Sequence, residues 1–110
     1  MQTENPTDER RVFERFPARF PTRFKDTRYD YGTNVALRDA SAEGVKIVSK
    51  ERLSLKDTID LEVKLPDSAT PFNIKGEVVW ITQAETNMWD IGLKFHAIDF
   101  VRMSRLYKFV

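Results

Sequence analysis

The chain has 110 residues, the size of one domain that buries about two-thirds of the surface its unfolded form exposes. It contains no cysteine and one histidine, which excludes disulfides, thiolate nucleophiles and cysteine metal sites, and no catalytic nucleophile with its base can be identified. The 18 basic and 17 acidic residues give a net charge of +1, so the whole surface has no general attraction for nucleic acid or membranes.

Positive charge is instead concentrated near the N-terminus. From Arg10 to Arg28, six arginines and one lysine stand against two acidic residues, a net charge of +5 over nineteen residues. Segmental charge of this kind indicates a site. No apolar run approaches the roughly 20 residues of a membrane span, and residues 1–8 lack the order of a signal peptide. We therefore expect a cytoplasmic protein without membrane insertion and without a nucleic-acid partner.

The first residues are predicted to be a tail followed by a ligand-gripping segment. Residues 1–8 are polar and have no apolar periodicity, which predicts disorder. Residues 9–17 then contain Arg10, Arg11 and Arg15. Arginine pairs bidentately with phosphate and stacks on flat rings. Three arginines within six residues therefore suit a ligand that carries both phosphates and bases.

Residues 18–96 are predicted to form a β-barrel, and its first strand follows the arginine segment. Arginine recurs every fourth residue there, but Pro17 and Pro21 would each break a helix. The pattern therefore predicts an extended strand with Arg19 and Arg23 on its solvated face.

Alternating apolar residues indicate five further strands. They are expected at residues 35–38, 45–48, 59–65, 72–82 and 89–95. A turn from Asp39 to Gly44 separates the first two of these strands. In the long strand, Gly76 is expected to mark a bulge or a close approach, and Trp80 shares the apolar parity of Val78. Trp80 and Trp89 are therefore expected to pack in the core or at its edge.

The apolar period changes from 2 to 3.6 at Asp99, which predicts a helix over residues 99–110 with Asp99 as its N-cap. The apolar stripe of this helix consists of Phe100, Met103, Leu106, Tyr107 and Val110. Short strands at regular spacing followed by one helix indicate an all-β fold with one C-terminal helix. We expect a six-stranded antiparallel β-barrel whose opening the helix covers.

Four stretches of the chain occur in an order that carries a family resemblance. They are Arg11-x-x-x-Arg15, Asp39-x-Ser41-x-x-Gly44, the strand end Val78-Val79-Trp80 and the run Gly92-Leu93-Lys94-Phe95. The chain resembles the PilZ domain family over residues 9–110. The resemblance implies a six-stranded barrel with a C-terminal helix that acts as a bacterial receptor for the second messenger cyclic di-GMP, in processes such as motility and biofilm formation. Some PilZ domains lack the arginine motif, whereas this chain has both motifs.

The resemblance also implies roles for the motif residues. Arg11 and Arg15 are expected to grip phosphate and guanine, the alternative being a solvated charge run. Asp39 can accept the N1–H and N2–H₂ donors of guanine while the Ser41 hydroxyl bonds nearby. The alternative for both is an Asx or Ser turn that satisfies the hairpin backbone. Gly44 fits either a positive φ or a close approach of the ligand.

Two further cations are possible ligand contacts. Arg10 stands directly before the arginine motif and offers an extra stacking surface, which we expect to hold a second molecule of cyclic di-GMP. Lys94 lies on the predicted barrel exterior, where it either adds a cation near the site or is a plain surface lysine.

The leading functional hypothesis is a non-catalytic sensor without cofactor or metal. Residues 9–17 would fold over cyclic di-GMP, and an unidentified downstream protein would read the changed surface. The alternative is a nucleotide-independent protein-interaction module of a motility or pilus system. A third class, a small barrel that binds oligonucleotides, is disfavoured because the Asp-x-Ser-x-x-Gly turn suits recognition of a discrete base.

Overall fold

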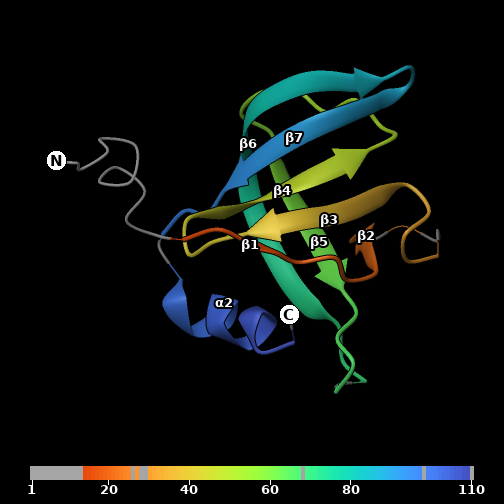
Figure 1. The fold of residues 1–110 in the computed structure, drawn as a ribbon. Coiled ribbons are helices and arrows are strands. Elements are labelled where there is room, and N and C mark those ends of the chain that lie inside the picture. Colours follow the sequence, from red (N-terminus) through yellow and green to blue (C-terminus); the bar gives the residue numbers. More distant parts are fainter. Residues whose placement is uncertain (1–13, 26, 28–29, 68, 98, 110) are drawn as a thin grey trace, which may run out of the picture.

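A computed structural model of the chain describes residues 14–25, 27, 30–67, 69–97 and 99–109. In these residues the elements are β1 (Phe16–Pro17), β2 (Thr22–Phe24), β3 (Val35–Ala40), β4 (Gly44–Ser49), β5 (Thr58–Val63), β6 (Phe72–Glu85), β7 (Met88–Lys94) and α2 (Phe100–Tyr107) (Figure 1). The predicted tail at residues 1–8, Arg10 and Arg11 lie outside the described residues.

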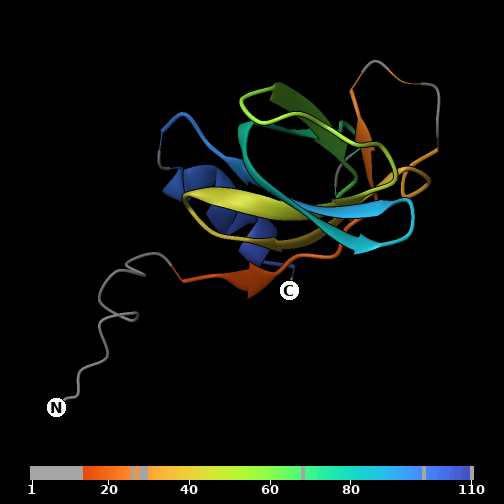
Figure 2. The same ribbon diagram turned by 90° about the horizontal axis from the view of Figure 1, so that it is seen from above.

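The described strands form one antiparallel sheet in the order β1-β3-β4-β7-β6-β5-β2. The sheet curls into a half-barrel, as Figure 2 shows from above. A single antiparallel bridge between Pro21 and Ala36 of β3 brings the two ends of the sheet together. The predicted fold class, all-β with one C-terminal helix, is confirmed.

The strand predicted after the arginine segment is divided into two short strands, so the described residues contain seven strands where the sequence predicted six. β1 pairs with β3 at one end of the sheet, where Pro17 lies opposite Asp39. β2 pairs with β5 at the other end, where Thr22 lies opposite Val63. Pro17 and Pro21 each lack the N–H that a continuous ladder requires, and the chain crosses between the two sheet ends from one proline to the other.

The inward side chains of the strands form the core, as their alternation predicts. The largest fully buried ones on the strands are Leu37, Ile47, Leu61, Ile74, Ile91, Val45, Val63 and Val78. Gly76 is a close-approach point, since a Cβ there would lie 3.0 Å from the Cβ of Leu93 on β7. Trp89 is half-buried and packs against this core, in agreement with the prediction.

Trp80 does not share the core parity that the sequence predicts. The pairing of β6 with β7 shifts between Val78 and Trp80, so Val79 is an extra residue in the ladder. A β-bulge of this kind reverses the side-chain parity of the residues beyond it. Val78 is therefore buried while Trp80 is 41% exposed on the outer face. The prediction that Trp80 packs in the core or at its edge is wrong for this reason.

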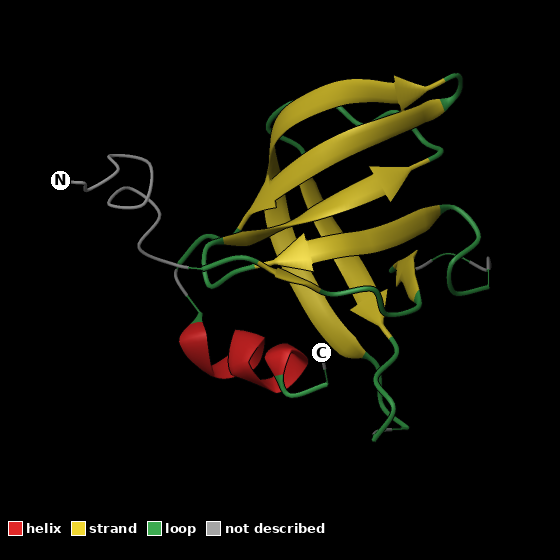
Figure 3. Ribbon diagram, in the orientation of Figure 1, coloured by secondary structure: helices red, strands yellow, loops and turns green. Residues whose placement is uncertain are grey.

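The helix α2 lies at one end of the half-barrel, outside the strands (Figure 3). Met103 and Leu106 face the core, and the Asp99 carboxylate accepts a hydrogen bond from the Arg102 backbone N–H at 2.9 Å, which confirms the predicted N-cap. Tyr107 is 62% exposed, contrary to its place on the predicted stripe, and its ring packs edge-to-face with Phe16 on β1. No helix in the described part of the chain is long and apolar enough to cross a membrane.

Arg23 lies on the outer face of β2, as predicted, but it is paired there and not free in solvent. Its Nε donates to the Glu62 carboxylate on β5 at 2.8 Å, and its guanidinium lies 4.4 Å from the centre of the Tyr31 ring. The hydrogen bond to Glu62 raises the pKa of Arg23 above its already high ordinary value.

Candidate functional site

The hairpin between β3 and β4 carries the second predicted motif. The Ser41 backbone N–H donates to the Gly44 carbonyl at 2.9 Å, and the Ser41 hydroxyl accepts from the Glu43 backbone N–H at 3.1 Å. Ser41 is fully buried. The structure therefore shows the turn-forming use of this hydroxyl that the sequence left as an alternative, and a ligand contact by Ser41 stays a prediction.

Gly44 allows β4 to approach β7 closely. A Cβ at this position would overlap the carbonyl oxygen of Leu93 and lie 3.1 Å from the Cα of Lys94. Among the described glycines the positive φ belongs to Gly32, at +84°, so a positive φ is not the reason for Gly44. The close approach that requires this glycine is to the backbone of a neighbouring strand.

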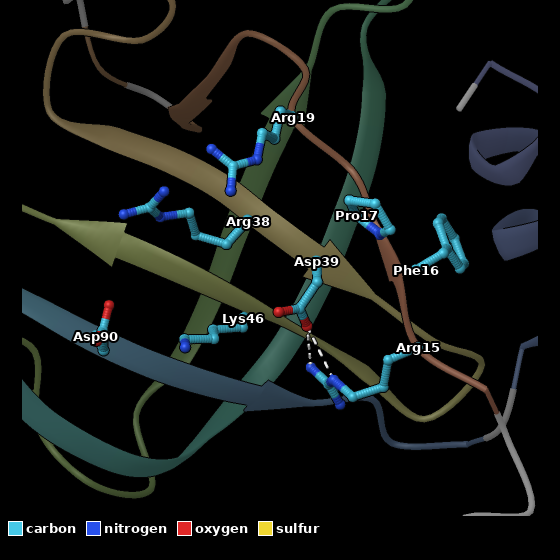
Figure 4. Close-up of a pocket in the computed structure, with 8 residues that line it drawn as sticks. All are labelled: Arg15, Phe16, Pro17, Arg19, Arg38, Asp39, Lys46 and Asp90. Carbon is cyan, nitrogen blue, oxygen red and sulfur yellow. Dashed lines mark hydrogen bonds and ion pairs between the residues drawn. The ribbon is translucent and has the colours of Figure 1, made fainter.

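Arg15 and Asp39 join the two motifs in space. The Arg15 Nε donates to Oδ1 of Asp39 at 2.9 Å, and a terminal guanidinium nitrogen donates to the same oxygen (Figure 4). The pairing of Pro17 with Asp39 across β1 and β3 brings Arg15 to this position. In the described residues the Asp39 carboxylate is therefore bound by the arginine motif and not by the backbone of its own hairpin.

The Arg15–Asp39 pair forms one wall of a pocket of about 490 Å³. The lining residues are Arg15, Phe16, Pro17, Arg19, Arg38, Asp39, Lys46 and Asp90, which come from β1 and the residues on either side of it, β3, β4 and β7 (Figure 4). Four cationic side chains in this lining stand against two carboxylates. The pocket is therefore suited to an anionic ligand.

Three of these cations were not predicted as site residues. Arg19 was expected on a solvated strand face; it is exposed, but it lies between β1 and β2 and lines the pocket. Arg38 and Lys46 received no role from the sequence beyond membership of the strands predicted at residues 35–38 and 45–48. Their one sequence signal is proximity, since Arg38 directly precedes Asp39 and Lys46 follows Gly44 by two residues.

A cross-strand row on the outer face continues from Asp39. Asp39 pairs with Lys46, Lys46 pairs with Gly92, and Gly92 pairs with Trp80. The Trp80 indole lies over Gly92, because a Cβ on Gly92 would overlap its ring. The Lys46 ammonium lies 6.0 Å from the centre of that ring. On the outer face of the sheet, the site therefore continues from the Asp39 carboxylate through the Lys46 ammonium to the Trp80 ring.

Lys94 lies on the barrel exterior, as the sequence predicts. It is exposed at the end of β7, opposite Gly44 and Glu77, and it does not line the pocket that contains Asp39. No group of three or more metal-ligating side chains occurs in the described ranges of the chain.

Comparisons with known proteins agree with this architecture. A family model for the PilZ domain matches residues 9–110. No curated protein matches the chain. Among solved structures, the chain is similar to the Bacillus subtilis inhibitor of motility MotI/DgrA, with a TM-score of 0.63 and 17% sequence identity. The similarity covers 91% of this chain and 48% of that one, so this chain spans about half the length of that structure. At this identity the likeness shows the fold alone.

Proposed function

The chain belongs to the PilZ domain family, and we propose that it is a receptor for cyclic di-GMP. PilZ domains are non-catalytic binding modules, so the chain is not an enzyme, as its sequence predicts. The observation that carries the proposal is the contact between Arg15 and Asp39. It unites two motif segments 24 residues apart at the wall of a cationic pocket.

The pair has the chemistry that a guanine nucleotide requires. The Arg15 guanidinium can fork onto a phosphate, and the Asp39 carboxylate can accept two donors from one edge of guanine. Both side chains are about one-third exposed, at 37% and 30%. An exposed ion pair contributes about 0–1 kcal/mol, whereas a hydrogen bond to a charged group contributes about 1.5–3 kcal/mol. A ligand that forms one new hydrogen bond with Arg15 and another with Asp39 can therefore displace the ion pair between them.

The remaining predicted residues support these two contacts. We propose that Arg11 adds a second guanidinium to the phosphates and that Arg10 stacks on a base, where it holds a second ligand. Ser41 and Gly44 maintain the hairpin that carries Asp39, through the Ser turn and the close packing of β4 on β7. Lys94, like Ser41 and Gly44, lies outside the lining of the pocket, and a ligand contact by Lys94 stays a prediction.

We propose that ligand binding changes the conformation of residues 9–17 and that a downstream protein in the cytoplasm reads this change. The support is the position of β1, since Arg15 directly before it binds Asp39 while Phe16 packs edge-to-face with Tyr107 at 5.1 Å between ring centroids. One short segment thus contacts both the site and α2.

Hydrogen exchange tests this coupling. We expect the amides of residues 9–17 to exchange more slowly with saturating cyclic di-GMP, because the arginines are then held by the ligand. The amide of Leu61, buried in β5 away from the site, serves as the control and should be unchanged. Equal protection of residues 9–17 with and without ligand would contradict the conformational mechanism.

Titration calorimetry decides between the two leading functions. The receptor is expected to bind cyclic di-GMP and not GTP or cyclic AMP, because GTP carries one guanine with all its phosphates in a single chain and cyclic AMP carries no guanine. A nucleotide-independent interaction module of a motility or pilus system predicts no binding heat with any of the three. That result would overturn the receptor function.

A further inference from the structure

The pocket contains cations that its own carboxylates do not neutralise. Arg15 is paired with Asp39, but among the described residues Arg19, Arg38 and Lys46 form no ion pair. Unpaired cations that converge on one concave surface raise the local positive potential and attract anions. The excess charge of the pocket therefore lies on residues outside both motifs.

A bulge in β3 brings Asp39 onto the same outer face as Arg38. In a regular strand, Arg38 and Asp39 would point to opposite faces of the sheet. The pairing of β3 with β4 shifts between Leu37 and Asp39, so Arg38 is the extra residue of a bulge. Both Arg38 and Asp39 then line the same pocket on the outer face.

Lys46 stands beside Asp39 on the neighbouring strand. The two residues are direct cross-strand partners, which places their Cβ atoms about 4.5–5.5 Å apart. The Lys46 ammonium lies at the outer limit of a cation–π contact with Trp80, 6.0 Å from the ring centre, so this contact does not occupy it. Lys46 extends the cationic surface along the row that leads away from β1.

The position of Asp39 separates two regions that can hold phosphate. Its carboxylate disfavours a phosphate directly beside it, whether or not Arg15 remains bound. A ligand with two phosphates and a guanine held by Asp39 therefore needs cations on more than one side of that carboxylate. Arg15, directly before β1, supplies one side, and Arg38 with Lys46 supplies the other from β3 and β4.

We propose that Arg38 and Lys46 together bind one phosphodiester group of the ligand. They form a phosphate-binding site outside the arginine motif and the Asp39–Gly44 motif. This inference rests on the proposed receptor function and adds to it the direction of the ligand, which lies over β3 and β4 toward β7. This phosphate-binding site selects ligands with two phosphodiester groups over nucleotides with one.

Calorimetry with cyclic di-GMP on single and double variants tests the proposal. Arg38→Ala and Lys46→Gln are each expected to lose about tenfold or more in affinity, the cost of one charge-assisted hydrogen bond. Because both act on one phosphate, the double variant should lose less than the product of the two single losses. Lys46→Arg retains the charge and should retain most of the affinity.

Arg52→Ala is the matched control, since Arg52 is an exposed cation outside the pocket. Two results would overturn the shared phosphate-binding site. One is a loss of affinity in Arg38→Ala or Lys46→Gln no larger than in Arg52→Ala, and the other is a loss in the double variant equal to the product of the two single losses. Thermal unfolding of each variant should match the wild type, because the exposed Arg38 and half-buried Lys46 contribute nothing to the core. If the wild type itself does not bind cyclic di-GMP, the receptor function fails and this inference fails with it.

Discussion

Replacement of Arg15 by alanine is expected to weaken cyclic di-GMP binding about tenfold to more than a hundredfold. The substitution removes the guanidinium that joins the two motifs, and a hydrogen bond to a charged group contributes about 1.5–3 kcal/mol. The melting temperature should change little, because the exposed pair with Asp39 contributes only about 0–1 kcal/mol to folding. Calorimetry and a thermal scan of the same sample measure the two effects.

Two variants make this test specific. Arg15→Lys keeps the charge but loses the planar fork, so it should recover only part of the affinity if the contact is bidentate. Arg52→Ala removes an exposed arginine outside the pocket and should bind as the wild type does. Arg19 and Arg23 are unsuitable controls, since Arg19 lines the pocket and Arg23 is paired with Glu62. An equal loss in Arg15→Ala and Arg52→Ala would contradict a role for Arg15 as a ligand contact.

Most of the fold could be predicted from the sequence because its strands alternate cleanly. Leu61 and Val63 are buried between outward-facing polar residues, and the helix cap at Asp99 is local chemistry that needs no tertiary information. The divided first strand was missed because pairing partners far apart in the chain decide it. Alternation around Pro17 and Pro21 cannot show that β1 and β2 pair at opposite ends of the sheet.

The site could be predicted only where a motif named its residues. Arg15 and Asp39 lie in such motifs, and the structure brings them into contact. Arg38, Lys46 and Trp80 belong to no motif, and the β-bulges in β3 and β6 decide on which face Asp39 and Trp80 lie. A bulge inserts one residue and so reverses which side chains of the strand face the core, and no particular residue type marks its position. Alternation alone therefore predicts the wrong face for the residues beyond the bulge.

Replacement of Gly44 by alanine is expected to lower the free energy of unfolding by about 1–3 kcal/mol, the cost of overpacking a well-packed interior. The added Cβ would overlap the Leu93 carbonyl oxygen, which belongs to the backbone of β7 and cannot rotate away as a flexible side chain can. For a domain of this size each kcal/mol corresponds to about 4–8 °C in melting temperature. Chemical denaturation monitored by tryptophan fluorescence measures the change.

Gly32→Ala separates this effect from the general cost of replacing a glycine. Gly32 has a φ of +84°, but no atom lies within 4 Å of the position of its Cβ, so alanine there bears only backbone strain. That strain is about 1–2 kcal/mol for a residue in the left-handed region. Gly44→Ala should in addition separate β4 from β7 and displace the hairpin that carries Asp39, and should therefore lose ligand affinity as well as stability. Gly32 lies outside the pocket lining, so Gly32→Ala should keep wild-type affinity at temperatures where it is folded. A Gly44→Ala protein as stable as the wild type would contradict the close approach of the two strands.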